Sequence, residues 1–127
     1  LAERYGVRHR IRFLGHCRDV SGELAAAAVF VLPSRKEGMP NALLEAMSAG
    51  LAVIVNDASP GPLEFVTHGH NGLVVPHGDA AALAKAMVQL QSDPQLRIRL
   101  GLAAQDRLKT QDWPVLESIW NAALAMG

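Results

Sequence analysis

Short apolar runs alternate along the chain with longer segments of helical period. Val29–Leu32 is apolar at every position, which is typical of a parallel strand that is covered on both faces. Residues 11–14 and 52–55 and Leu73–Val75 are the other predicted strands. Each of these runs is short enough for a strand of a small domain.

Helical segments lie between these runs. Residues 41–49 contain no internal breaker and stop at Gly50, which suits a left-handed helix cap. Asp79 and Asp93 are each placed to cap a helix, and Pro94 fits the first turn of the second one. The predicted helices cover residues 21–28, 41–49, 79–90 and 93–108, with a last one that opens at Asp112-Trp113-Pro114.

Strands that alternate with helices predict an α/β fold, a Rossmann-like parallel sheet flanked by helices. Residues 56–62 are expected to form a polar loop, and residues 68–72 a turn, because both are rich in Gly, Pro or Asn. In sheets of this kind, ligands gather where strands end and helices begin. The turn after Val29–Leu32 is therefore the expected site.

Two carboxylates flank that turn, Glu37 before the predicted helix and Glu45 within it. The free backbone amides at the start of a helix favour anions, so the site suits a phosphorylated ligand. The neighbours of Glu45 are apolar, so its carboxylate needs a bonding partner if the helix is buried. The alternative is that Glu45 lies in the first helical turn, where the helix dipole stabilises it by about 0.3–1 kcal/mol.

The same stretch resembles the donor-binding motif of retaining nucleotide-sugar glycosyltransferases of family 4 (group 1). These enzymes have the GT-B fold, with two facing Rossmann-like domains. The matching residues of the motif are Pro33-Ser34, Glu37-Gly38 and Glu45-Ala46-Met47, and the two glutamates have the family's spacing. Further matches lie upstream at residues 11–15 and downstream at residues 50–54, 61–64 and 71–75, although the family usually has Pro in place of Ala52. The resemblance spans residues 8–108.

The resemblance implies a role for each matching residue. Glu37, Gly38 and Met39 would bind the donor sugar. The backbone amides of Asn41 and Ala42 would hold the phosphate. Glu45 would bind the ribose, because an ionised carboxylate offers only acceptors and a vicinal diol offers two donors.

The loop that holds the nucleotide base in the family corresponds here to His16, Cys17 and Arg18. The chain departs from the family at Met39-Pro40, where many relatives have Phe-Gly, and Pro40 has no amide to offer a phosphate. The implied ligand is a nucleoside-diphosphate sugar, with UDP or GDP as its nucleotide. It is a co-substrate, so no cofactor is expected, and no metal.

Length and family pattern together suggest a partial domain. The 127 residues amount to one domain, and the chain begins at Leu1. In the resembled family, two further strand-helix units with pyrophosphate ligands and a whole acceptor-binding domain come earlier. We therefore expect residues 1–127 to be a single donor-binding piece, the C-terminal half of a GT-B fold. It would hold no catalytic residue and would be inactive alone, with the acceptor bound by the missing N-terminal domain.

The composition argues against some classes of partner and location. Lys plus Arg and Asp plus Glu balance at 12 each, so no global charge favours nucleic acid. No stretch approaches the roughly 18 consecutive apolar residues of a membrane span, and Cys17 is the single cysteine, which excludes an internal disulfide. The expected location is the cytoplasm, with a peripheral position at the inner face of a membrane as a further option.

Several functions compete for this pattern. The family implies a metal-independent glycosyltransferase of the hexosyltransferase type that acts in polysaccharide biosynthesis, with retention of configuration. A hydrolase with paired carboxylates is disfavoured because one carboxylate precedes the helix and the other lies within it. The chain has no Asp-x-Asp pair, and its histidines, among them His68 and His77, do not form a metal-binding pattern. A nucleotide-sugar epimerase or phosphorylase of the same fold, or a non-catalytic nucleotide-binding or interaction module, remains an alternative.

Overall fold

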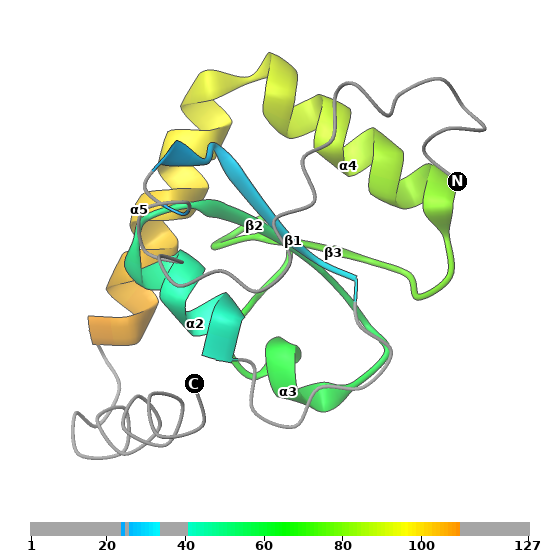
Figure 1. Ribbon diagram of the computed structural model, residues 1–127, viewed down its shortest axis with the longest axis horizontal. Helices are drawn as coiled ribbons and strands as arrows, with labels where there is room; N and C mark the ends of the chain where they lie inside the picture. Colours follow the sequence, from blue (N-terminus) through cyan, green and yellow to red (C-terminus); the bar gives the residue numbers. More distant parts are fainter. Residues whose placement is uncertain (1–23, 25, 34–40, 110–127) are drawn as a thin grey trace.

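Among the residues that the structure describes, a three-stranded parallel sheet forms the centre of the fold (Figure 1). The computed structural model describes residues 24, 26–33 and 41–109. Its elements are β1 (Val29–Leu32), α2 (Asn41–Ser48), β2 (Ala52–Asn56), α3 (Pro60–Leu63), β3 (Leu73–Val75), α4 (Ala80–Ser92) and α5 (Pro94–Lys109). The predicted α/β fold with a parallel sheet flanked by helices is confirmed. The strand expected at residues 11–14, residues 21–23 and 25 of the helix expected at 21–28, and the helix opening at Asp112 lie outside the described residues. Of the helix expected at 21–28, residues 24 and 26 are helical and residues 27–28 are not.

The central strand β2 explains why the predicted strands are apolar at consecutive positions. Val53 and Val55 pack in one hydrophobic cluster with α2, whereas Ala52 and Ile54 pack in a second cluster with α4. All four side chains are buried. Because both faces of β2 are covered by helices, alternation of apolar and polar residues is absent from this strand.

A left-handed glycine ends α2, as predicted. Gly50 has a φ of 79°, and its N–H donates to the carbonyl of Met47 at 3.0 Å, while the N–H of Leu51 donates to the carbonyl of Ala46 at 3.1 Å. These two bonds form a Schellman motif, which turns the chain directly from α2 into β2.

The two predicted aspartate caps are also confirmed. The carboxylate of Asp79 accepts from the N–H of Ala82 at 2.9 Å at the start of α4, and that of Asp93 accepts from the N–H of Leu96 at 3.0 Å at the start of α5. Among the described helices, none is long and apolar enough to cross a membrane.

One prediction for the connections is wrong. Residues 56–62 are not all loop, because the short helix α3 begins at Pro60. Proline has its φ fixed near the helical value and needs no partner for an N–H in the first turn, so it favours this start. Glu64 lies at the C-terminal cap of α3.

The turn at residues 68–72 is confirmed, and it depends on a buried asparagine. Asn71, 1% exposed, donates from Nδ2 to the carbonyl of Phe65 at 2.8 Å and accepts at Oδ1 from the N–H of Thr67 at 2.7 Å. Next to it, His68 Nδ1 accepts from the N–H of Val74 at 2.9 Å. These side-chain bonds hold the loop from α3 at the start of β3.

The long helix α5 joins the two clusters. Leu100 packs in the cluster with α4, while Ala104 and Leu108 pack in the cluster with α2. A Cβ built on Gly101 would overlap the backbone carbonyl of Gly50, so the two backbones touch at this point. The side-chain amide of Gln105 also donates to the carbonyl of Ser48 at 3.2 Å, which satisfies one free carbonyl at the end of α2.

We expect Gly101→Ala to destabilise the chain by about 3 kcal/mol, because the added methyl group meets a backbone atom that cannot rotate away. In an open helix position the same change would stabilise by about 1 kcal/mol. The free energy of unfolding from urea denaturation measures the difference. Leu102→Ala, at the adjacent exposed position, is the control and should stay within about 0.5 kcal/mol of wild type. Unchanged or increased stability of Gly101→Ala would contradict the close contact.

Candidate functional site

The three strands end along one edge of the sheet, at Leu32, Asn56 and Val75. Because the strands are parallel, the helices that follow them begin at the same edge, α2 after β1 and α4 after β3. Ligands of open α/β sheets bind at such an edge.

On one side of the sheet, α2 carries three of the predicted site residues. Asn41 is its first residue and Glu45 its fifth, and both are half-buried, while Ala42 is exposed. Residues four apart lie on the same side of a helix, so Asn41 and Glu45 form a polar row. The opposite side of α2 is buried in the core through Leu43, Leu44, Ala46 and Met47.

The position of Glu45 decides between the two explanations given for it. The first turn of α2 contains no acidic residue, so stabilisation of Glu45 by the first turn is wrong. Within the described part of the chain, its carboxylate forms no hydrogen bond or ion pair. Glu45 therefore has acceptors available for a ligand.

The other predicted site residues fall outside the part of the chain that the structure describes. Glu37, Gly38 and Met39, expected at the donor sugar, lie outside the described residues. The same holds for His16, Cys17 and Arg18, expected at the base. Of the predicted site, the structure brings together Asn41, Ala42 and Glu45.

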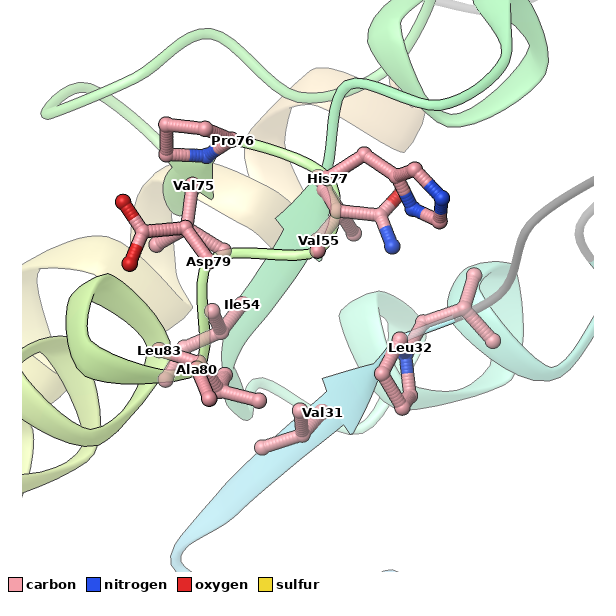
Figure 2. Close-up of a pocket in the computed structure, with 13 residues that line it drawn as sticks. Val31, Leu32, Ile54, Val55, Val75, Pro76, His77, Asp79, Ala80 and Leu83 are labelled. Carbon is pink, nitrogen blue, oxygen red and sulfur yellow. The ribbon is translucent and has the colours of Figure 1, made fainter.

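On the other side of the sheet, the same edge holds a cavity of about 320 Å³. Val31, Ile54 and Leu83 line it between β1 and α4, and all three belong to the hydrophobic cluster on the α4 side (Figure 2). Its polar lining comes from Asn56, His77 and Asp79. Asn41, Ala42 and Glu45 are not among its lining residues, so the cavity and the polar row of α2 are separate features of one edge.

Hydrogen bonds fix the loops at the mouth of the cavity. The carboxylate of Asp57 accepts from the N–H of His77 at 2.8 Å, and the N–H of Asp57 donates to the carbonyl of Val75 at 3.2 Å. Asp79 is engaged as the cap of α4, and Figure 2 shows its carboxylate pointing away from the apolar lining. The Asp57 side chain therefore ties the end of β2 to the segment that leads into α4.

Asn56 and His77, which line the cavity, were not predicted from the sequence as site residues. Asn56 is the last residue of β2 and follows an apolar run, so its place at a strand end was a usable signal. His77 was considered only as a metal ligand. Its place beside Asn56 depends on the pairing of β2 with β3, which brings Asn56 opposite Val75.

Comparison with known proteins gives a consistent family. Residues 1–93 match the family described as Glycosyl transferases group 1. The chain is 40% identical over 111 residues to the lipopolysaccharide core biosynthesis glycosyltransferase LpsE of Rhizobium meliloti, covering 87% of this chain and 32% of that protein. It is 36% identical over 115 residues to the D-inositol 3-phosphate glycosyltransferase of Streptomyces bingchenggensis, covering 89% of this chain and 25% of that protein.

A solved structure also resembles this chain. The Anabaena protein Alr3699/HepE, in complex with UDP and glucose, superposes with a TM-score of 0.84 at 26% identity, over 99% of this chain and 35% of that one. The chain thus spans a quarter to about a third of the length of these relatives.

We expect Asp57→Ala to lower the free energy of unfolding by about 1 kcal/mol, because the N–H of His77 loses its acceptor at an exposed position. Asp57→Asn is the matched control, since its side-chain oxygen still accepts, and it should stay within about 0.5 kcal/mol of wild type. Urea denaturation measures both, and amide exchange at His77 reports the local opening. Equal losses in the two variants would show that the bond does not stabilise the loop.

Proposed function

Because this chain belongs to the group 1 glycosyltransferases, we propose that it binds the nucleotide-sugar donor from which a sugar is transferred to an acceptor. The observation that carries the proposal is the polar row of Asn41 and Glu45 at the edge where the strands end. The Anabaena structure that resembles nearly the whole chain was solved with UDP and glucose, which supports UDP as the nucleotide.

The proposed binding mode follows the ligand from ribose to sugar. Glu45 accepts from the ribose hydroxyls, as an ionised carboxylate with no competing partner among the described residues. The free amides at the start of α2, at Asn41 and Ala42, hold the phosphate. Glu37, Gly38 and Met39 bind the sugar, and His16, Cys17 and Arg18 lie beside the base, as the family motif implies.

The proposed reaction is a metal-independent transfer with retention of configuration. The acceptor oxygen bonds to the anomeric carbon on the face that the nucleoside diphosphate leaves, while the bond from that carbon to the β-phosphate oxygen breaks. The acceptor proton passes to the departing phosphate. Amides that already point at the phosphate stabilise the negative charge that develops on it.

The activity is proposed for the whole protein and not for these residues alone, because the chain spans no more than about a third of these relatives. The acceptor would be held by another domain. LpsE of Rhizobium meliloti is named for lipopolysaccharide core biosynthesis. We propose an acceptor in polysaccharide synthesis for this chain too, on the cytoplasmic side of a membrane.

Glu45→Gln should weaken UDP binding about tenfold, because the charge-assisted bonds to the ribose become neutral ones. The melting temperature should hardly change, since the carboxylate bonds nothing in the described structure. Calorimetric titration of the chain with UDP, GDP and ADP measures the affinity and identifies the base.

Asp106→Asn is the control for the lost charge, because Asp106 is exposed on α5, and its UDP affinity should stay within about twofold of wild type. Equal affinity of wild type and Glu45→Gln would refute the ribose contact. A wild-type chain that binds none of the three nucleotides or their sugar conjugates would refute donor binding by this chain.

The stereochemical part of the proposal has its own test. The protein that contains this chain should give a first-formed product with the anomeric configuration of the donor. Proton NMR of that product, recorded before mutarotation, reports the configuration. A product of inverted configuration would contradict retention and leave the donor-binding proposal intact.

A further inference from the structure

One side-chain atom among the described residues is buried without a hydrogen-bond partner, the carboxamide oxygen Oδ1 of Asn41. A buried carbonyl oxygen that accepts no bond is costly, and native structures contain few of them. Each such atom needs an explanation, and a functional role is one of them. The place of this atom in the fold therefore matters.

The buried asparagine Asn71 provides a comparison within the same chain. Both polar atoms of its carboxamide are bonded, Nδ2 to the carbonyl of Phe65 at 2.8 Å and Oδ1 to the N–H of Thr67 at 2.7 Å. Asn71 therefore has a structural role that its contacts explain. The oxygen of Asn41 has no such contacts.

Helix capping does not explain Asn41 either. Asn and Asp near a helix start commonly accept an N–H of the first turn. The carboxylates of Asp79 and Asp93 do so in α4 and α5, at 2.9 and 3.0 Å, whereas Oδ1 of Asn41 accepts none. Asp79 and Asp93 lie directly before their helices, whereas Asn41 is the first residue of α2, and its oxygen does not act as a cap.

The chemistry of the oxygen selects the ligand group that it can bind. A carbonyl oxygen only accepts, so it cannot bond the oxygens of an ionised phosphate, which only accept as well. Within a nucleoside-diphosphate sugar, the groups that donate are the hydroxyls and the N–H groups of the base. Oδ1 of Asn41 therefore suits a hydroxyl or a base N–H and not the diphosphate.

The order of the groups along the ligand indicates which donor Oδ1 of Asn41 meets, a hydroxyl of the sugar. Asn41 lies on the same side of α2 as Glu45 but about 6 Å nearer the start of the helix. With the ribose at Glu45 and the phosphates at the first amides, the next group along the ligand is the sugar. We propose that Asn41 Oδ1 accepts a hydrogen bond from a hydroxyl of the donor sugar and so helps to select that sugar. This inference rests on the proposed donor-binding function.

Calorimetric titration with UDP and with UDP-glucose separates the sugar contact from the rest. The quantity to compare is the ratio of the Kd for UDP-glucose to the Kd for UDP. Asn41→Leu, which has a similar size and no acceptor, should raise this ratio about tenfold over wild type. Asn41→Asp keeps an acceptor, and the repulsion of its charge by the diphosphate affects both ligands alike, so its ratio should stay within about twofold. Ser48→Ala, at an exposed position of the same helix, should leave the ratio unchanged.

The melting temperature gives an independent readout. Asn41→Leu removes a buried oxygen without a partner, so the Tm of the free chain should rise by about 3 °C. A fall in Tm would show that the side chain has a structural role and would overturn the inference.

The remaining outcomes of the titrations distinguish a failure of the Asn41 contact with the sugar from a failure of donor binding. If Asn41→Leu weakens UDP and UDP-glucose by the same factor, or weakens neither, the contact with the sugar is refuted while donor binding stands. If wild type binds neither ligand, the donor-binding function and this inference fail together. If the ratio rises in Asn41→Leu, deoxy analogues of UDP-glucose identify the hydroxyl, because the variant should not discriminate against the analogue that lacks it.

Discussion

The contact between the backbones of α5 and of the turn after α2 is the constraint on which the candidate site depends. Gly101 lets α5 approach the carbonyl of Gly50 more closely than any other residue would allow. The Gln105 amide bonds the last carbonyl of α2 beside this contact. Both interactions act on the C-terminal end of α2, and because a helix of eight residues is rigid over its length, they also set where its first residue lies.

The sheet then determines which parts of the molecule can carry chemistry. Both faces of β2 are covered, one by α2 and the other by α4, and its apolar side chains are buried. Within the described part of the sheet, polar side chains therefore gather where the strands end, as Asn56 does at the end of β2. That edge holds two separate features, the polar row on α2 and the cavity between β1 and α4.

The features that the sequence predicted are those with local signals. The strand runs at residues 29–32, 52–55 and 73–75, the glycine cap at Gly50 and the aspartate caps at Asp79 and Asp93 each depend on a few neighbouring residues, and these are confirmed. The start of α3 at Pro60 was missed because a proline-rich segment fits both a loop and a first helical turn. The cavity could not be predicted, because its lining comes from three strands and α4 and depends on their register.

On α2, the residues that stabilise the fold differ from those that we propose to bind the ligand. A helix of eight residues is too short to be stable alone in water, so it persists because Leu43, Leu44, Ala46 and Met47 are buried. A change at any of these positions alters stability and site together. Asn41 and Glu45 lie on the opposite side, and their side chains bond nothing in the described part of the chain. They contribute little to holding the helix in place. The packing of α2 therefore assigns them no part in holding the helix, which agrees with the ligand contacts that we propose for them.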